Sequence, residues 1–150
     1  MVEASSDFDM TKVLRNVEDK MEFNDWVKKG PTFVDQLGMT LPMVYLMSAA
    51  PPETEVLRLI LSATKDISIN HAHTINGSTA LIVAACNEAT PLESFKLLVE
   101  AGANVNDTDN YAESVFAKLS QFRKDYKEIA NYLVEKGAVI NSVQAESIAN

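Results

Sequence analysis

A stretch of ten residues recurs with little change 35 positions later in this chain. Residues 97–106 are LLVEAGANVN, and residues 132–141 are YLVEKGAVIN. A unit this short cannot bury its own apolar face, so a regular recurrence means that similar supersecondary units stack and share one continuous core. The recurrence therefore predicts a repeat protein, whose specificity lies in exposed positions that differ between the units.

Composition is compatible with one folding unit. The chain has 150 residues, of which 47% are hydrophobic, enough for one ordinary core or a short array. It has no run of about 18 apolar residues, residues 1–10 are polar and acidic where a secretory signal would be basic and then apolar, and Cys86 is the single cysteine. These features predict a soluble protein of the cytoplasm, a reducing compartment, without an internal disulfide.

Charge narrows the class of partner. The formal net charge is −8 at pH 7, and the acidic excess is spread along the whole chain. Nucleic-acid phosphate and anionic membranes are normally bound by clustered basic residues, so neither is expected as a partner. The charge favours another protein with a basic or neutral face, bound by a monomer of this chain. The alternative is that mild acidity serves only solubility.

Turn and helix signals define one unit between residues 76 and 106. Residues 76–78 (NGS) predict a turn, and Thr79 follows where its hydroxyl can cap an inner helix of small apolar residues. Pro91 suits the first turn of a second helix, whose apolar residues recur at three- and four-residue steps. Gly102 ends that helix through a left-handed cap. Each unit is thus predicted to be a pair of helices.

Three motifs resemble the ankyrin repeat. Residues 102–106 (GANVN) match that family's Gly-Ala-Asp/Asn-Val-Asn loop, residues 77–81 (GSTAL) are similar to its Gly-x-Thr-Pro-Leu motif, and residues 109–114 (DNYAES) resemble its Asp-x-x-Gly-x-Thr finger turn. The resemblance implies an all-α fold, a short solenoid of stacked helix-turn-helix units with finger loops. It also implies a non-catalytic protein-interaction module without cofactors.

The chain departs from the family pattern at several positions. The Pro and His of the family's Thr-Pro-Leu-His motif are replaced by Ala80 and Ile82 in one unit and by Val115 and Ala117 in the next, so the usual hydrogen bonds of that His are absent. Ala112 stands where the finger turn expects glycine. Either this alanine adopts a strained conformation with positive φ, or the turn is of another type.

The resemblance divides the chain into four units and a tail. Residues 71–106 are the clearest repeat, and residues 36–70 align with them as a weaker one. We expect residues 1–35 to be a divergent N-terminal capping repeat and residues 107–141 to be a C-terminal capping repeat, whose charged outer helix closes the stack. Residues 142–150 are too few for another unit and are expected to be a tail.

Signals for catalysis or metal binding are weak. His71 and His73 alternate, so both rings would face one side of an extended segment at a finger tip, but no third ligand is near in the sequence. Cys86 has no histidine aligned to activate it, so we expect a small packing residue rather than a nucleophile. Asp107 and Asp109 lack the glycine and later glutamate of an EF-hand. We predict neither an enzyme nor a metal site.

The resemblance implies that partners bind to the finger tips and to the exposed face of the inner helices. On the fingers, the candidate partner-binding residues are Gln36, Leu37, Met39, His71, His73, Ile75, Ser78, Asp107, Asn110, Tyr111 and Glu113. On the inner helices, the candidates are Ile82, Cys86, Lys118 and Gln121. An exposed Ile75 or Tyr111 would be a natural hot spot, because large apolar anchors in polar surroundings tend to dominate binding energy.

Two functions are consistent with such a surface. An adaptor or scaffold would bind its partner moderately and leave it active. A dedicated inhibitor, such as an immunity or decoy protein, would bind tightly and block a partner enzyme or regulatory factor. The adaptor is the preferred interpretation, and the small size and acidity of the chain keep the inhibitor as the alternative.

Overall fold

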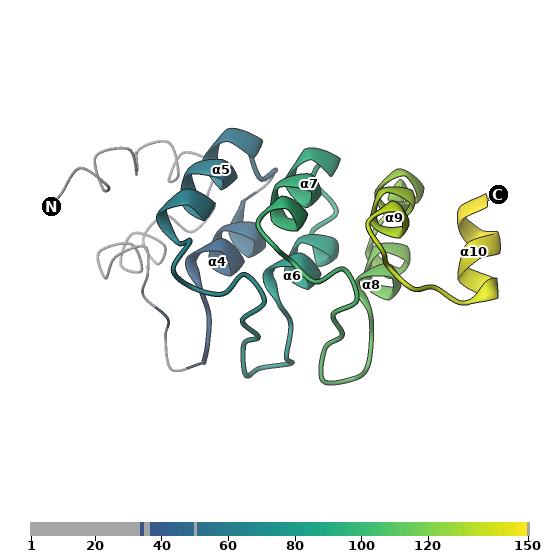
Figure 1. The fold of residues 1–150 in the computed structure, drawn as a ribbon, viewed down its shortest axis with the longest axis horizontal. Helices are drawn as coiled ribbons and strands as arrows, with labels where there is room; N and C mark the ends of the chain where they lie inside the picture. The colour runs from purple at the N-terminus through teal and green to yellow at the C-terminus, as the bar shows by residue number, and fades with distance from the viewer. Residues whose placement is uncertain (1–33, 35–36, 50, 150) are drawn as a thin grey trace, which may run out of the picture.

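Paired helices joined by long loops make up the fold. A computed structural model describes residues 34, 37–49 and 51–149 (Figure 1). Within these residues the helices are α4 (Leu41–Ser48), α5 (Thr54–Ala63), α6 (Ala80–Cys86), α7 (Leu92–Glu100), α8 (Val115–Phe122), α9 (Tyr126–Glu135) and α10 (Ser142–Ala149). The predicted N-terminal capping repeat lies, apart from residue 34, outside the described residues, and so does Gln36.

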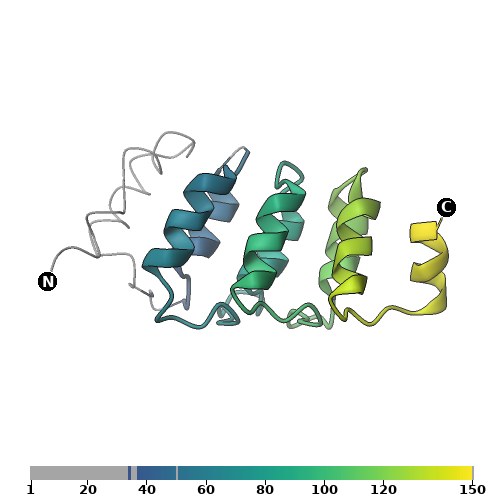
Figure 2. The ribbon, with the colours of Figure 1, turned by 45° about the horizontal axis from the view of Figure 1, so that its top comes forward.

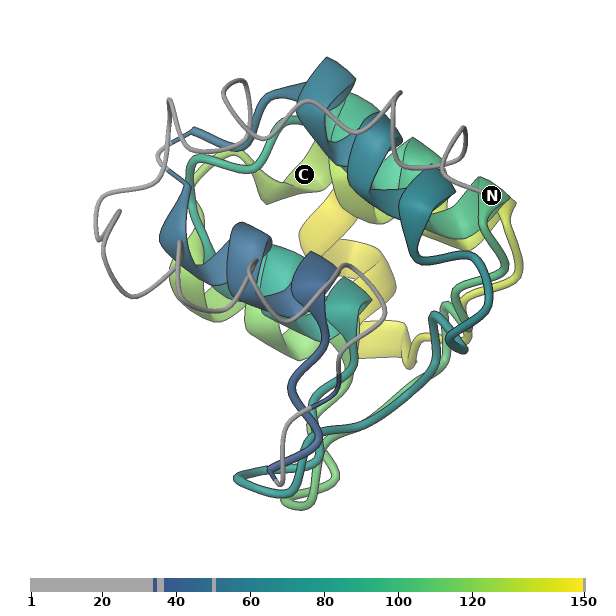
Figure 3. The ribbon, with the colours of Figure 1, turned by 90° about the vertical axis from the view of Figure 1, so that its left-hand side faces the viewer.

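The helix pairs stack in two layers. Helices α4, α6 and α8 form an inner layer, and α5, α7 and α9 form an outer layer beside it (Figure 2). In the view along the stack, the units superimpose and their finger loops project together from the inner layer (Figure 3). An isolated antiparallel bridge between Thr108 and Ser114 closes the third finger. None of the described helices is long and apolar enough to cross a membrane.

Small apolar residues allow α6 to lie at the centre of the stack. Every residue from Ala80 to Ala85 is buried, because α6 packs against α4, α7 and α8. The outer helices bury only one face: in α7, Phe95 and Leu98 are fully buried, whereas Glu100 is exposed. The stack therefore has the continuous core that a repeat protein requires.

Asparagine side chains clamp each long loop to the next unit. Asn70 Nδ2 donates to the Gly102 carbonyl at 3.0 Å, and Asn70 Oδ1 accepts from the Asn104 amide at 2.7 Å. Asn106 makes the same pair of bonds to the loop after α9, at 3.1 and 2.8 Å. Backbone groups of exposed loops are thereby satisfied by the neighbouring unit, which helps to hold successive units at one spacing.

The two best-defined inner helices begin with different caps. Thr79 occupies the N-cap position of α6, but its hydroxyl accepts no hydrogen bond from the helix, so the predicted cap is wrong. Ser114, at the same position of α8, accepts from the Ala117 amide at 3.2 Å. The Thr79 residue is buried, so packing here takes precedence over a cap worth about 1 kcal/mol.

Ala112 takes the conformation of the glycine that it replaces. Its φ is +60°, the one positive φ recorded for a non-glycine residue in the described part of the chain. The finger turn is intact: the Asp109 carbonyl accepts from the Ala112 amide at 3.0 Å, and Asp109 Oδ1 accepts from the amides of Tyr111 and Glu113 at 2.9 and 3.0 Å. Of the two alternatives, the strained conformation is therefore the correct one.

Ala112→Gly is expected to raise the free energy of unfolding by about 1 kcal/mol, because glycine has no Cβ to clash at positive φ. The greater chain entropy of unfolded glycine offsets part of the relief of strain. Urea denaturation of both proteins measures the difference. Ala117→Gly, inside α8, is the matched control and should lose stability. Loss of stability in both variants would contradict the prediction.

Residues 142–149 differ from the expected tail, because they form α10 beside α9 (Figure 1). A reciprocal cap begins the helix: the Gln144 amide donates to Asn141 Oδ1 at 2.8 Å, and the Asn141 amide donates to Gln144 Oε1 at 2.9 Å. Ile148 is buried, and the hydroxyls of Tyr126 and Ser147 are hydrogen-bonded. The expectation that α9 closes the stack is therefore wrong, since α10 packs beyond it.

Candidate functional site

A groove of about 560 Å³ lies between the second finger and the last turns of the inner helices. Its apolar lining comes mainly from the inner layer, namely from Met47, Ala49, Val83, Cys86 and Phe122. Its polar lining comes from the second finger and the α6–α7 loop, namely from His73, Asn76, Ser78, Asn87 and Glu88. Such a hollow suits an apolar side chain whose neighbours carry polar groups.

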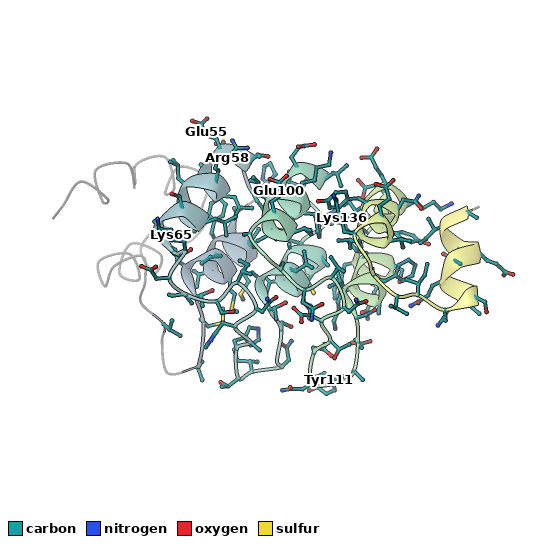
Figure 4. All side chains as sticks on the ribbon, in the orientation of Figure 1. Glu55, Arg58, Lys65, Glu100, Tyr111 and Lys136 are labelled. Atoms are coloured by element: carbon teal, nitrogen blue, oxygen red, sulfur yellow. The ribbon has the colours of Figure 1, made fainter. Side chains whose placement is uncertain are left out.

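Exposed side chains, largely apolar, form two rows on this side of the stack. The tip row has one residue from each finger, and its members Leu37, Ile75 and Tyr111 are 46%, 63% and 74% exposed. The end row has one exposed residue from the last turn of each inner helix, namely Met47, Cys86 and Phe122. Figure 4 shows Tyr111 at the end of the third finger, on the opposite edge of the molecule from Glu55 and Arg58 of α5.

Backbone hydrogen bonds between fingers hold the tip row in register. The Leu37 carbonyl accepts from the Thr74 amide at 2.7 Å and from the Thr74 hydroxyl at 3.0 Å. The Asn76 carbonyl accepts from the Asn110 amide at 2.7 Å. Each bonded residue belongs to the tip row or lies next to a member of it. The three exposed side chains are therefore positioned by the backbone before any partner binds.

Hydrogen bonds from the Asn87 side chain connect two elements that line the groove. Its Nδ2 donates to the carbonyls of Leu46 and Ala49, both at 2.9 Å, and its Oδ1 accepts from the Ala89 amide at 3.0 Å. These bonds join the end of α4 to the loop that follows α6. Met47 and Cys86 of the end row are thus held at a set separation, which reduces the entropy that binding would cost.

A buried ion cluster lies beneath the third finger. Lys118 Nζ is 3.0 Å from Asp109 Oδ2 and 2.6 Å from Glu113 Oε1. The Asp109 side chain is fully buried, and Lys118 is only 8% exposed. Because Asp109 also accepts the amide bonds of the finger turn, this cluster joins α8 to the finger that carries Tyr111.

Lys118 and Asp109 are both held in their charged forms. The hydrogen bond to Glu113 raises the pKa of Lys118 above its ordinary value, against the effect of burial, and Asp109 adds to the rise. Burial alone would raise the pKa of Asp109, but the Glu113 amide, the Lys118 ammonium and the Tyr111 amide together hold it below its ordinary value. Both groups are therefore charged at neutral pH, and they neutralise each other.

The groove side of the stack carries an excess of negative charge. Within residues 37–49, 71–88 and 104–122, which form the fingers and inner helices, Lys118 is the only Lys or Arg, and its charge is occupied by the ion cluster. The carboxylates in the same segments are Glu88, Asp107, Asp109 and Glu113. The outer helices carry Lys or Arg as well as Asp or Glu, so their charges nearly balance.

Many of the predicted partner-binding residues do reach the surface. The exposed or half-buried ones are Leu37, His71, Ile75, Cys86, Asp107, Asn110, Tyr111, Glu113 and Gln121. The structure brings Leu37, Ile75 and Tyr111 into the tip row and places Cys86 in the groove. Gln121 lies in the last turn of α8, next to Phe122 in the sequence. Whether each of these contacts a partner stays a prediction.

The other candidates are buried, so the expectation that they are exposed is wrong for them. They are Met39, His73, Ser78, Ile82 and Lys118, with exposed fractions of 8% or less. Ile82 has no free face because α6 lies between α4 and α8. His73 is enclosed by the close approach of the first and second fingers, where a Cβ on Gly38 would lie 3.2 Å from the His73 Cα.

The groups considered for chemistry are not assembled into a reactive site. His73 is buried and His71 half-buried, so the pair is not the exposed pair that the sequence predicts. Among the described residues, no three His, Cys, Asp or Glu side chains are placed to hold a metal ion. Cys86 is exposed rather than packed in the core. Partial burial raises the pKa of its thiol, which therefore stays protonated at neutral pH.

Two exposed apolar residues of the groove are absent from the sequence-based set. Met47 is 57% exposed and Phe122 is 44% exposed. The helical stripe of α8, with Phe116 and Leu119 buried, continues to Phe122, so the sequence pattern predicts a core residue there. Met47 aligns with Cys86 when the inner helices α4 and α6 are superimposed on their first residues. This alignment is the one sequence signal that places Met47 in the groove.

The stacked helix pairs, the finger loops and the groove define a repeat solenoid that offers one extended surface. Residues 45–144 match the family model for ankyrin repeats, in three copies. The chain therefore belongs to the ankyrin-repeat family, whose repeats are generally protein–protein interaction modules. The predicted fold class is confirmed. None of the curated proteins compared with the chain matches it in sequence.

Proposed function

We propose that this chain binds a partner protein through the groove and the tip row, and performs no chemistry on it. The distribution of exposed apolar side chains carries the proposal. Among the described residues, the large exposed ones on the groove side are Leu37, Met47, Ile75, Tyr111 and Phe122, and the others, Val134, Val139 and Val143, lie at the C-terminal end of the stack. An apolar surface that continues over three units is typical of a protein-binding site.

The rigidity of this surface supports the same function. Finger backbones are hydrogen-bonded to each other, and Asn87 joins the end of α4 to the end of α6, so binding orders few groups. Tyr111 offers a large amphipathic side chain with few rotatable bonds, which gives contact area at low entropic cost. The protonated thiol of Cys86 adds apolar contact rather than a nucleophile.

Photo-crosslinking tests the proposal directly. A photoreactive amino acid in place of Ile75 or Tyr111 is expected to crosslink one partner in the cells that make the protein, because both positions belong to the tip row. The same amino acid in place of Arg58, an exposed residue on α5 at the opposite edge, is the matched control and should not (Figure 4). Crosslinks are identified by mass spectrometry.

Equal crosslinking from Arg58, or none from both tip-row positions, would count against the proposal. Circular dichroism of each variant checks that the helical stack is intact. The cytoplasmic location and the monomeric state stay predictions of the sequence, and the same crosslinking experiment reports on the second, because a dimer would yield a product of two copies of this chain.

A further inference from the structure

The spacing of the two apolar rows restricts the backbone that can lie on them. Both rows have one member per unit, because each finger and each inner-helix end contributes one exposed apolar side chain, although Ile75 and Phe122 are each shifted by one residue from the position of the other members of their row. Neighbouring helices pack about 8–10 Å apart, so each row offers an apolar contact roughly every 10 Å along the stack. A partner segment that uses a whole row must present apolar side chains on one face at this interval.

An extended strand does not meet this requirement. Its side chains alternate between faces, so residues on one face recur at about 6.7 Å and then about 13 Å. An α-helix does meet it, because seven residues complete nearly two turns and rise about 10.5 Å. A polyproline II helix, with about 9.3 Å for three residues, is the other regular backbone near this interval.

The presence of two rows favours the α-helix. A helix with apolar residues at the first and fourth positions of each heptad carries two adjacent apolar rows, each with a period of about 10.5 Å. One such row would face Leu37, Ile75 and Tyr111, while the other would enter the groove toward Met47, Cys86 and Phe122. The remaining five positions of each heptad are free to carry charge.

The negative charge of the groove side determines which charge the remaining positions of the partner helix should carry. Lys118, the single Lys or Arg within residues 37–49, 71–88 and 104–122, is paired with Asp109 and Glu113, and Glu88 lines the groove. Asp107 and Glu113 lie half-buried near the third finger. An acidic helix would be repelled there, whereas Lys and Arg flanking the apolar rows would be attracted and would speed association.

From the spacing, the two rows and the charge we infer that the partner presents a basic amphipathic α-helix, which lies along the stack with its two apolar rows against the tip row and the end row. This inference rests on the proposed function, because it names the kind of segment that the same surface binds. The bound helix would be about three heptads long, because this is the length that three units span.

Displayed peptide libraries test the inference. The first library has random apolar residues at the first and fourth positions of three heptads and Lys or Arg at most other positions. The second has the same composition with the apolar residues at alternate positions. The third is the first with Glu in place of Lys and Arg, and the fourth places the apolar residues at every third position of a proline-rich chain. Binders to the whole chain are expected from the first library.

Affinity measurements on a selected peptide then locate the contact. Ile75→Ser and Phe122→Ser, one from each row, are each expected to weaken binding about ten-fold, as the loss of an apolar anchor does. Val139→Ser, 82% exposed at the C-terminal end, is the matched control and should leave the affinity unchanged. Circular dichroism of the complex should show a gain in helix from the peptide.

Several results would overturn the inference. They are enrichment from the second, third or fourth library that equals the first, no enrichment from the first, and equal affinity for Ile75→Ser, Phe122→Ser and Val139→Ser. The proposed function can survive such results: a partner crosslinked at Tyr111 while the helical library yields no binder means that the surface binds another kind of segment. Failure of both experiments would reject both statements.

Discussion

Lys118→Met is expected to lower the free energy of unfolding by about 3 kcal/mol, because it leaves a buried Asp109 carboxylate without its cation. Methionine conserves most of the side-chain volume, so the loss reflects charge rather than a cavity. The value is at the low end of the range for broken buried pairs because Glu113 retains contact with water. Urea denaturation at pH 7 measures it.

Two comparisons isolate the ion cluster. Lys96→Met removes a half-exposed ion pair with Glu93 and should change stability by less than about 1 kcal/mol. Addition of Asp109→Asn to Lys118→Met should recover part of the loss, because the double variant no longer buries an unpaired charge. Additive losses from the two substitutions would mean that Lys118 and Asp109 do not interact.

The pH dependence of Lys118→Met has a definite sign. In the wild type the pKa of Asp109 is below its ordinary value, so its contribution is present above about pH 4 and is lost as the pH falls through the lowered pKa. Without Lys118, burial raises the pKa of Asp109, and the carboxyl protonates at higher pH. The stability difference between the two proteins should therefore shrink as the pH falls from the raised pKa of Asp109 in the variant toward its lowered pKa in the wild type.

Gly77→Ala is expected to cost about 2 kcal/mol, or roughly 8 °C in Tm. Its φ is +77°, and an added Cβ would lie 2.8 Å from Asn110 Cγ and 3.1 Å from the Asn110 amide nitrogen. The variant thus combines backbone strain with displacement of the third finger from the second. Because the Asn110 amide bonds to Asn76, the tip row should also lose its register. Differential scanning calorimetry measures the shift.

Gly137→Ala separates the two contributions. Its φ is +104°, but an added Cβ would meet no atom within 4 Å, so only strain of about 1 kcal/mol is expected. Gly77→Ala combined with Asn110→Ala should recover the part that comes from overlap. If Gly77→Ala were no worse than Gly137→Ala, the close approach of the two fingers would not limit the residue at this position.

The sequence predicts the fold well because the signals for it are local. Gly102 ends an outer helix, and Asn106 lies in the loop that leads to the next finger. Both recur 35 residues later, as Gly137 and Asn141. Such turn and loop residues act within a few positions of the chain, so one copy of the motif is enough to identify the unit. The family and the all-α stack are confirmed on these grounds.

The end of the stack shows where a repeat pattern misleads. Asn141 aligns with Asn106, which clamps the following loop, yet its side chain caps α10 instead. The pattern contains no unit after residue 141, so it predicts a tail. A short helix that packs on α9 with one buried isoleucine, Ile148, needs no repeat signal.

The candidate site is less predictable than the fold, because exposure depends on side chains that lie outside the residue's own helix. Lysine is a residue type usually found at the surface, yet Lys118 is buried and paired with two carboxylates. Phenylalanine is usually found in the core, yet Phe122 is 44% exposed. His73 is covered by a finger from the preceding unit. None of these neighbours is adjacent in sequence, so periodicity alone misplaces all three.

The sequence by itself determined the repeating unit and its family, because a helix pair, its turns and its loop asparagines are set by short-range backbone chemistry. Only the tertiary structure decided which side chains form the surface. Stacking buries a residue when the neighbouring unit covers it and leaves it exposed when nothing does, so Leu37, Ile75 and Tyr111 are exposed on the fingers, whereas Ile82 is buried in α6.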